Sequence, residues 1–426
     1  MMHIEKLYQL YKQHPCIETD TRKLKEGDLF FALKGENFNG NLFAKQALEK
    51  GAASVIVDEQ LNFEDDRIII VEDVLATLQL LAKHHRQQFN IPFLAITGSN
   101  GKTTTKELIH AVLSIQFKTS TTEGNFNNHI GIPITLLKIP FDCEIAVIEM
   151  GANHQKEIAA YCTYVLPTHG LINNVGKAHL EGFGGIEGVK KGKGELYDFI
   201  RESGGTIFIN TDFDYLQEMS AGITKRITYG TNIAQTTGKI IDSEPFLEVE
   251  ITSKLELGSI KTQLVGAYNC PNILAAVAVG KYFNVPHEKV KAAIENYTPS
   301  NSRSQLIHKG SNHIILDAYN ANPSSMKLAI ENFANLQAPN KILMLGSMAE
   351  LGNESLFEHE QLVELIQSFA WSNVVLVGSD FLNIKHPYLS FINSTETAQW
   401  FRDQNFEQAY ILIKGSRSVK MEKIIE

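Results

Sequence analysis

The stretch from Pro92 to Lys106, PFLAITGSNGKTTTK, constrains the fold more strongly than any other part of the sequence. Its apolar run, Phe93 to Ile96, predicts a buried strand, and a glycine-bracketed turn and apolar residues at helical spacing follow it. A strand, a glycine-rich turn and a helix start together form a cradle in which backbone N–H groups and the positive end of the helix dipole face anionic oxygens. The sequence therefore predicts an α/β sheet that carries a phosphate-binding loop.

The residue types within this loop match that chemistry. Gly98 and Gly101 let the backbone curl, Lys102 can reach the β- and γ-phosphates, and the Thr103 hydroxyl can bind Mg²⁺. Because Ile96 stands where the longer G-x-x-x-x-G-K-[ST] pattern has glycine, the loop is a shorter G-x-x-G-K-T form. The alternative is a plain strand–turn–helix connection with a surface lysine. We predict an ATP or GTP site formed by Gly98, Ser99, Asn100, Gly101, Lys102, Thr103 and Thr104.

Bulk properties narrow the class of protein. A chain of 426 residues predicts two or three domains, and a net charge of −9 disfavours a general nucleic-acid binder. No run resembles a signal peptide or approaches the length of a membrane span, so we expect a cytoplasmic protein without membrane insertion. The cysteines are scattered without a C-x-x-C pair, which favours reduced thiols and disfavours a zinc site.

Alternating strand-like and helical runs predict three α/β domains. The boundaries are expected to give a small first domain, a central P-loop domain with a mostly parallel sheet, and a Rossmann-like third domain, at residues 1–90, 91–298 and 299–426. Within the central domain, the segment 204–266, including a strand at 262–265, is expected to be an antiparallel appendage. The chain is expected to end with a helix over 419–425.

Polar residues at predicted strand ends are candidates for the site. Glu149 ends an apolar strand, where a second Mg²⁺ contact belongs beside a P-loop; an ordinary strand-end acid is the alternative. His179 lies in a glycine-rich loop after the next strand and is a candidate metal ligand, although a lone histidine is more often structural. The asparagine-rich run that contains Asn125 and Asn128 marks a backbone that bends near a ligand.

Other polar loops leave alternatives open. Thr21, Arg22 and Lys34 are either solvated turn residues or hold a polar, anionic ligand between two loops of the first domain. Asn272, at a helix start, is either a cap or an adenine-binding amide. In the third domain, the segments 317–323, 346–352 and 414–417 follow strands, where such sheets bind ligands.

Taken together, these segments resemble the Mur ligases of peptidoglycan synthesis, and the resemblance covers essentially the whole chain. The motifs that carry it are TDTR with GDLFF (19–22 and 27–31), the short P-loop, GNFNNHIGIP (124–133), EMG (149–151), AHLEGFG (178–184), KGE (193–195), DAYNANP (317–323) and KGSR (414–417). The short P-loop of this family also accounts for the missing glycine at position 96.

The resemblance implies a three-domain ligase whose domains hold a UDP-sugar, ATP and the incoming amino compound. The loop 319–323 fits the members that add a dipeptide, so UDP-N-acetylmuramoyl-tripeptide and D-alanyl-D-alanine are the implied substrates of a monomer. A carboxylate would attack the γ-phosphate, and the amine would then displace phosphate from the acyl phosphate.

The resemblance also assigns residues. Lys102, His179 and Lys193 would be catalytic, and Thr103, Glu149, His179 and Lys193 would hold two Mg²⁺ ions, Lys193 as a carbamate. The other assignments are Asn272, Arg303 and Asp317 to ATP, and Thr21, Arg22, Lys34, Asn125, Asn128, Asn320 and Asn322 to the other substrates. Ser347 departs from the family, which usually has aspartate there.

Three alternatives compete with this hypothesis. A sister ligase would add one amino acid, but the diaminopimelate-adding enzymes carry an Asp-Asn-Pro-Arg motif that this sequence lacks. Folylpolyglutamate synthase shares the P-loop and the last domain but lacks this first domain. A non-catalytic nucleotide switch would not need a third domain lined with polar loops.

Overall fold

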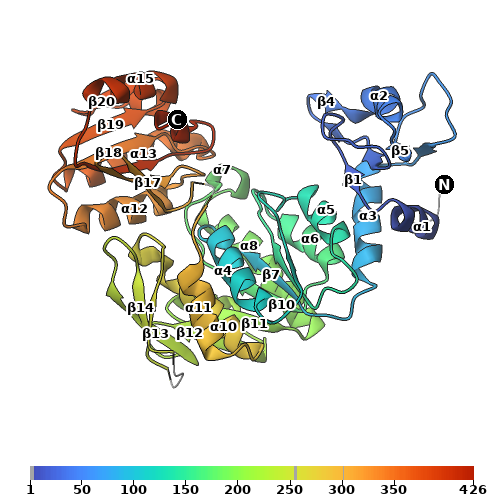
Figure 1. Cartoon of the computed structure of the whole chain (residues 1–426), viewed down its shortest axis with the longest axis horizontal. Helices are drawn as coiled ribbons and strands as arrows, with labels where there is room; N and C mark the ends of the chain where they lie inside the picture. Colours follow the sequence, from blue (N-terminus) through green and yellow to red (C-terminus); the bar gives the residue numbers. More distant parts are fainter. Residues whose placement is uncertain (1–3, 254–256, 301) are drawn as a thin grey trace. The chain divides into compact units, whose positions relative to one another are not determined.

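A computed structural model describes residues 4–253, 257–300 and 302–426 (Figure 1). The predicted fold class is confirmed, because the strands form mostly parallel sheets with helices between them. The chain divides into two compact units. The first contains residues up to Ile96 together with 117–152 and 157–170, and the second contains 97–116, 153–156 and 171–426.

The first unit begins with a small parallel sheet of strand order β1-β2-β5-β6. Its core is formed by side chains such as Phe30, Val55 and Val57, which lie at alternate positions and are almost completely buried. The strands are β1 (Ile17–Glu18), β2 (Leu29–Phe31), β5 (Ser54–Val57) and β6 (Ile68–Ile70). A hairpin and four helical segments accompany them: β3 (Lys34–Gly35), β4 (Phe38–Asn39), α1 (Ile4–Gln13), η1 (Gly40–Phe43), α2 (Ala44–Glu49) and α3 (Val74–Arg86).

A second group of strands in the first unit supports the loop predicted to bind phosphate. Strand β7 (Phe93–Thr97) pairs in parallel with β9 (Ile145–Glu149), and β9 pairs with β8 (Thr119–Thr121). Strands β7 and β9 are buried along their whole length, which explains their continuous apolar sequences. Helix α3 packs against α5 (Gly131–Leu137) and α6 (Glu157–Val165).

The second unit contains the helix that follows the P-loop and a further series of strands; β10 (His169–Ile172) spans the boundary between the units. Helix α10 (Cys270–Tyr282) is almost entirely buried and packs on α4 (Lys102–Ser114). A Cβ at Gly280 of α10 would lie 2.7 Å from Cγ1 of Val112 in α4, so this glycine allows the close approach. The other helical segments are α7 (Leu180–Phe183), α8 (Ile186–Ser203), α9 (Asp214–Met219), η2 (Ala267–Asn269) and α11 (His287–Asn296).

The expected antiparallel appendage is only partly correct. Strand β11 (Thr206–Asn210) pairs in parallel with β12 (Lys225–Gly230), which pairs in parallel with β13 (Thr236–Asp242). Only the pairings of β13 with β14 (Glu248–Ile251) and of β14 with β15 (Ser259–Lys261) are antiparallel, among the strands described between 204 and 266. The strand expected at 262–265 is wrong: Leu264 and Val265 are buried, but as an irregular segment before η2.

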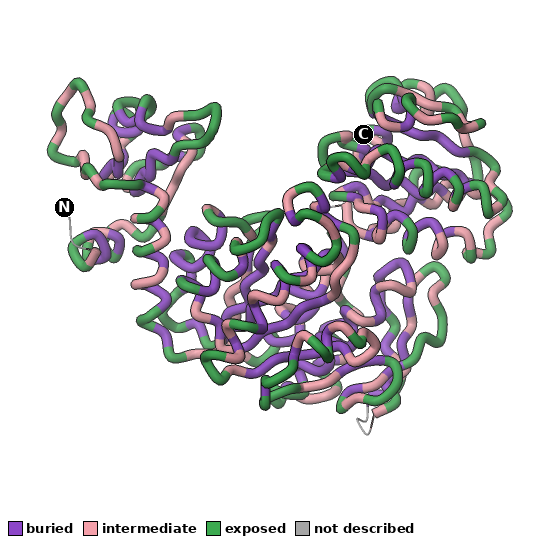
Figure 2. Tube along the Cα trace, turned by 180° about the vertical axis from the view of Figure 1, so that it is seen from behind, coloured by how far each residue is buried: buried purple, intermediate pink, exposed green. Residues whose placement is uncertain are grey.

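The C-terminal sheet has the order β16-β17-β21-β18-β19-β20 (orange and red in Figure 1). Its strands are β16 (Gln305–Lys309), β17 (Asn312–Asp317), β18 (Lys341–Gly346), β19 (Asn373–Val377), β20 (Leu389–Phe391) and β21 (Tyr410–Lys414). The pairing of β16 with β17 is antiparallel, whereas the other pairings are parallel. Figure 2 shows the buried strands in purple and the exposed connections in green.

Helices fill the connections of this sheet: α12 (Pro323–Asn335), η3 (Gly352–Glu354), α13 (Ser355–Gln367), α14 (Ser379–Leu382) and α15 (Ser394–Gln404). The helix expected over 419–425 is wrong. A short 3-10 turn, η4 (Met421–Ile424), replaces it and buries Met421 and Ile424 in the core of the sheet. Within the described ranges, no helix is both long enough and apolar enough to cross a membrane.

Candidate active site

The predicted phosphate cradle is present between β7 and α4. Gly98 and Gly101 have φ values of +146° and +79°, which L side chains rarely adopt. A Cβ at Gly98 would lie 2.8 Å from Cβ of Asn173, and one at Gly101 would lie 2.8 Å from Oδ1 of Asn272. Because α4 begins directly after Gly101, its free N–H groups point toward the loop.

The side chains of the loop are held in place by local hydrogen bonds. Lys102 Nζ donates to the backbone oxygens of Gly98 (2.7 Å) and Ser99 (3.2 Å), so its ammonium lies across the loop. The Ser99 hydroxyl donates to the Gly176 oxygen (3.0 Å) and accepts from the Gly176 N–H (2.9 Å). Thr103 is 6 % exposed, whereas Thr104 is half-buried.

A buried polar network lies directly beneath Gly101. Asn272 Oδ1 accepts from Thr105 Oγ1 (2.9 Å) and from Asn173 Nδ2 (3.2 Å), and Asn272 Nδ2 donates to Asn269 Oδ1 (2.8 Å). Asn173 Nδ2 also donates to Thr105 Oγ1 (2.7 Å). The Asn272 amide is therefore engaged with the protein, and its expected contact with adenine stays a prediction.

Glu149 fits the role of a cation ligand. It ends β9 opposite Ile96 of β7, is 1 % exposed, and accepts through Oε1 from Asn127 Nδ2 (2.8 Å). Its other oxygen, Oε2, is buried without a hydrogen-bond partner. Burial of a carboxylate oxygen without a partner is costly, and a bound cation would compensate its charge. The described residues include no group of three or more His, Cys, Asp or Glu side chains that could hold a metal ion.

His179 precedes α7 in the left-handed conformation (φ +53°), and its Nδ1 lies 2.6 Å from Oε2 of Glu350. The distance is that of an ion pair, although the hydrogen bond between the two atoms is not aligned. The contact with the His179 side chain lowers the pKa of the Glu350 carboxyl. The sequence analysis missed Glu350 as a site residue.

Lys193 lies on α8 and is 1 % exposed. Its Nζ lies 4.9 Å from the ring centroid of Phe183, which belongs to α7. A Cβ on neighbouring Gly192 would lie 2.4 Å from the same ring, so the glycine is what allows α7 to pack onto α8. His179 thus directly precedes α7, and Lys193 lies near the ring of the last residue of the same helix.

Of the four predicted residues on the loops of the C-terminal sheet, three contact other parts of the protein and one is exposed. Asn322 caps α12 and donates through Nδ2 to Oδ1 of the P-loop residue Asn100 (2.7 Å). Asp317 accepts from the Ser304 N–H (3.1 Å) and pairs with buried Lys414. The Arg303 guanidinium stacks 3.5 Å from the ring centroid of Tyr319.

The remaining loop residue, Asn320, is exposed. Its backbone oxygen accepts from Lys414 Nζ (3.4 Å). The side chain of Asn320 is therefore accessible to a ligand, as the prediction for this residue requires.

A cleft of about 370 Å³ opens at the carboxyl ends of the C-terminal strands. Serine hydroxyls from several loops line it, together with Asn393 and the carboxylates of Glu350 and Asp380. Ser355 Oγ donates to Asp380 Oδ1 (2.8 Å), which orients that carboxylate. Two carboxylates and many hydroxyls make this cleft complementary to a small cationic or ammonium-bearing molecule.

A buried histidine anchors the loop that carries Glu350. His359 Nε2 accepts from the Met348 N–H (3.0 Å), and Nδ1 lies 2.7 Å from the Ser355 oxygen. Desolvation lowers the pKa of the fully buried His359 imidazole, which favours the neutral form that these contacts require.

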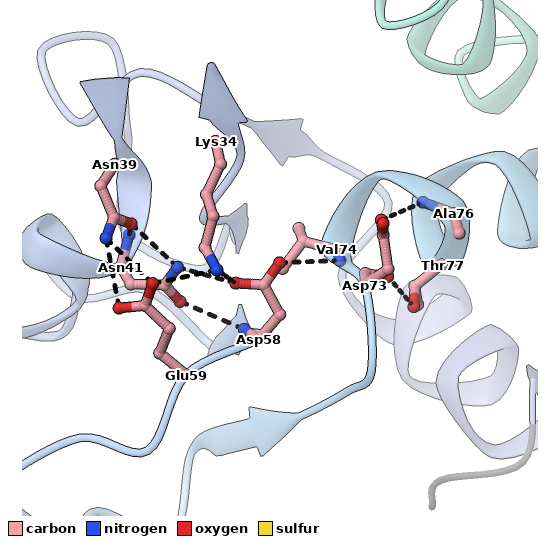
Figure 3. A network of polar contacts seen from close by, with 9 residues as sticks. All are labelled: Lys34, Asn39, Asn41, Asp58, Glu59, Asp73, Val74, Ala76 and Thr77. Carbon is pink, nitrogen blue, oxygen red and sulfur yellow. Dashed lines mark hydrogen bonds and ion pairs between the residues drawn. The ribbon is translucent and has the colours of Figure 1, made fainter. Parts of the chain in front are cut away.

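Thr21, Arg22 and Lys34, which are predicted to bind substrate, have partners within the first unit, and Figure 3 shows those of Lys34. Lys34 Nζ lies 3.0 Å from Asp58 Oδ1 and 2.9 Å from Glu59 Oε1, so two carboxylates already neutralise it. Arg22 pairs with Asp20 on the surface, at 2.7 Å. Thr21 Oγ1 donates to Gln46 Oε1 (3.0 Å).

The asparagines at positions 125, 127 and 128 have different surroundings. Asn128 Oδ1 accepts from the Gly131 N–H (2.9 Å) at the start of α5, and Asn125 is exposed. Asn127, which the sequence analysis did not single out, is the residue that contacts Glu149. A ligand-binding role for Asn125 and Asn128 remains a prediction.

Comparisons with known proteins agree along the chain. Residues 15–90 match the model "Mur ligase family, catalytic domain", residues 96–280 match "Mur ligase middle domain", and residues 302–417 match "Mur ligase, glutamate ligase domain". UDP-N-acetylmuramoyl-tripeptide–D-alanyl-D-alanine ligases of Bacillus subtilis and Escherichia coli are 35% and 36% identical, each over 96% of this chain and 92% of the relative.

Solved structures give the same result. A MurF crystal structure from Acinetobacter baumannii is 29% identical, covers 98% of this chain and 97% of its own, and has a TM-score of 0.87. A MurF ligase from Thermotoga maritima in complex with ADP is 26% identical, covers 100% and 97%, and also has a TM-score of 0.87. From its motifs, its fold and these matches, the chain belongs to the Mur ligase family.

Proposed function

We propose that this chain is an ATP-dependent ligase that joins D-alanyl-D-alanine to the terminal carboxylate of UDP-N-acetylmuramoyl-tripeptide, with release of ADP and phosphate. The observation that carries the proposal is the match, over nearly the full length of both chains, to relatives that are named for this reaction. The P-loop supports ATP use, and so does the ADP complex of the related T. maritima MurF ligase.

The chemistry requires activation of a poor electrophile. An oxygen of the tripeptide carboxylate attacks the γ-phosphorus of ATP, the bond from that phosphorus to the β,γ-bridging oxygen breaks, and ADP leaves from an acyl phosphate. The dipeptide amine then attacks the acyl carbon, loses a proton, and expels phosphate. Lys102 and the N–H groups of the loop stabilise the charge on the transferring phosphoryl group, because positioning and charge neutralisation dominate this type of catalysis.

The residues present fit Mg²⁺, which would neutralise phosphate charge when bound. Thr103 and Glu149 are the proposed ligands of a first ion, and His179 with carbamylated Lys193 those of a second. Formation of the carbamate needs the neutral amine, so the Lys193 ammonium first loses one proton. The nitrogen then bonds to the carbon of CO₂ and loses a second proton, which leaves an anionic carbamate whose oxygens could bind a metal ion. The unpaired Glu149 Oε2 and the burial of Lys193 support these assignments.

The C-terminal cleft is the proposed site of the dipeptide. Its two carboxylates, Glu350 and Asp380, are complementary to the ammonium group of D-alanyl-D-alanine, and its hydroxyls offer donors to the dipeptide carboxylate. The first domain is the proposed site of the UDP-sugar. We further propose a monomeric enzyme that acts in the cytoplasm, where these nucleotide substrates are found.

The test is ADP release from ATP with Mg²⁺ and UDP-N-acetylmuramoyl-tripeptide, with and without D-alanyl-D-alanine. We expect release that requires the dipeptide and is abolished in Lys102→Ala. Turnover with lysine or diaminopimelate on the UDP-dipeptide, and none with D-alanyl-D-alanine, would assign a sister ligase instead. ADP or ATP binding without turnover on any of these substrates would favour a nucleotide switch.

A further inference from the structure

Two residues with unusual backbone conformations meet between α7 and the loop Gly346–Gly352 of the C-terminal sheet. His179 has φ +53° and Glu350 has φ +63°, and neither is glycine. Such conformations persist where the surroundings fix them, and they are concentrated at functional sites. The two backbones also approach each other, since the Glu181 N–H donates to the Glu350 oxygen (3.4 Å).

The contact between the side chains of His179 and Glu350 involves one of the two imidazole nitrogens. His179 Nδ1 lies 2.6 Å from Glu350 Oε2, and the side chain of His179 is only 18 % exposed. A neutral imidazole carries one N–H, and the proton belongs on the nitrogen that faces an acceptor. With Nδ1 facing a carboxylate, Nε2 keeps its lone pair for another partner. A histidine that binds a metal through one nitrogen normally donates its other N–H to a carboxylate or carbonyl oxygen in this way.

Glu350 is itself fixed by the core of the C-terminal sheet. Two positions before it, the Met348 N–H donates to Nε2 of His359, which is fully buried. His359 is held in turn by the Ser355 oxygen. The carboxylate therefore projects toward α7 from a loop anchored by buried hydrogen bonds, and it also lines the C-terminal cleft.

We propose that Glu350 is a positioning residue, supplied by the C-terminal domain, that holds His179 in the Nδ1–H tautomer and keeps Nε2 available to a divalent cation. The proposal rests on the proposed role of His179 as a metal ligand. It goes further by making the metal affinity of the central domain depend on a side chain from the domain that carries the acceptor cleft. Glu350 would thus belong both to the surroundings of His179 and to the lining of the C-terminal cleft.

The first measurement is the tautomer of His179 in the full-length protein, read from long-range ¹H–¹⁵N correlations of ¹⁵N-histidine-labelled samples. The His179 signal is assigned by its loss in His179→Gln. We expect the Nδ1–H form in the wild type. We expect that form to be lost in Glu350→Ala but kept in Glu350→Gln, whose amide oxygen can still accept the hydrogen bond.

The second measurement is the Kd for Mn²⁺, followed by electron paramagnetic resonance with saturating ADP and UDP-N-acetylmuramoyl-tripeptide. We expect about a 10- to 100-fold weaker Kd in Glu350→Ala, as for other residues that orient a metal ligand. Glu350→Gln should fall between Glu350→Ala and the wild type. Glu354→Ala, which removes an exposed carboxylate near the same loop, is the matched control and should bind Mn²⁺ as the wild type does.

The outcomes separate this proposal from those on which it rests. An unchanged tautomer and an unchanged Kd in Glu350→Ala, with weaker binding in His179→Ala, would overturn the role of Glu350 and leave His179 as a ligand. An unchanged Kd in both variants would overturn the metal role of His179 as well. Neither result depends on ADP release, which tests the overall reaction.

Discussion

Replacement of Asn272 by alanine distinguishes support of the P-loop from recognition of adenine. The structure engages both ends of the Asn272 amide within the protein. In Asn272→Ala, the Thr105 hydroxyl loses its acceptor and Asn269 Oδ1 loses its donor, and both groups belong to residues at most 3 % exposed. Thr105 Oγ1 still accepts from Asn173 Nδ2, but its O–H donor and the Asn269 acceptor are left unpaired. Each such buried group costs about 1–3 kcal/mol, so we expect the free energy of unfolding to fall by about 2–6 kcal/mol.

The assay is urea unfolding of the full-length protein, combined with the Kd for ADP. Asn383→Ala, which removes an exposed amide, should change the unfolding free energy by less than about 0.5 kcal/mol. Thr105→Val removes the hydroxyl that donates to Asn272 and keeps the shape of the side chain. Because the two residues share one hydrogen bond, the double variant should be less destabilised than the sum of the single variants.

The reasoning is refuted if Asn272→Ala weakens ADP binding but alters stability no more than Asn383→Ala does. That result would return Asn272 to the role of an adenine-binding residue, as the sequence resemblance implies. Additive effects of Asn272→Ala and Thr105→Val would also contradict the network. A loss of stability accompanied by weaker ADP binding is the expected result, because the same amide lies under Gly101.

Three further predictions follow from single contacts. Gly101→Ala should weaken ADP binding by about 10-fold or more, because the new Cβ would approach the Asn272 amide and alanine disfavours a φ of +79°. Gly27→Ala is the control: its φ of +88° is equally strained, but its Cβ would lie in open space, so the Kd for ADP should not change. Equal Kd values for the two variants would contradict this account. Lys34→Met should raise the KM for the UDP-substrate by less than about threefold, since Asp58 and Glu59 already pair with the Lys34 ammonium. A rise of about 10-fold or more would instead support the substrate-binding role expected from the sequence. Burial lowers the pKa values of His85 and His359, so the folded state binds fewer protons than the unfolded state, and the free energy of unfolding should fall as the pH falls through about 6.5. In urea unfolding between pH 7.5 and 5.5, His359→Gln should weaken this dependence of the unfolding free energy on pH. An unaltered dependence would contradict the prediction.

The P-loop could be predicted from the sequence because every part of it is local. Strand β7, the two glycines and the start of α4 follow one another within one short stretch, and each has its own sequence signal. The same holds for the parallel C-terminal strands, whose apolar runs are buried on both faces. Such patterns depend on residues that are adjacent in the sequence, so they can be identified without knowing which distant residues they contact.

The errors arose where an apolar run has more than one way to become buried. Residues 262–265 read as a strand, but Leu264 and Val265 reach the core from an irregular segment. The last residues have helical spacing, yet Met421 packs in the sheet core from a 3-10 turn and approaches Gly346 and Gly415 too closely for a Cβ at either position. Short runs do not distinguish these outcomes, because tertiary packing decides between them.

The residues missed in the site have a different cause. Asn127 and Glu350 act through the side chains of Glu149 and His179, and the sequence places neither pair side by side. An asparagine in a glycine-rich run, or a glutamate in a loop after a strand, has many possible partners until the fold is known. The strand ends could be identified as sites because chemistry at those positions is common. Which second residue orients each ligand depends on the packing of α7 against the C-terminal loop and of β9 beside the asparagine-rich turn. The positioning residues are therefore a property of the folded chain, and the left-handed backbone of Glu350 and the unpaired oxygen of Glu149 are the features by which the structure reveals them.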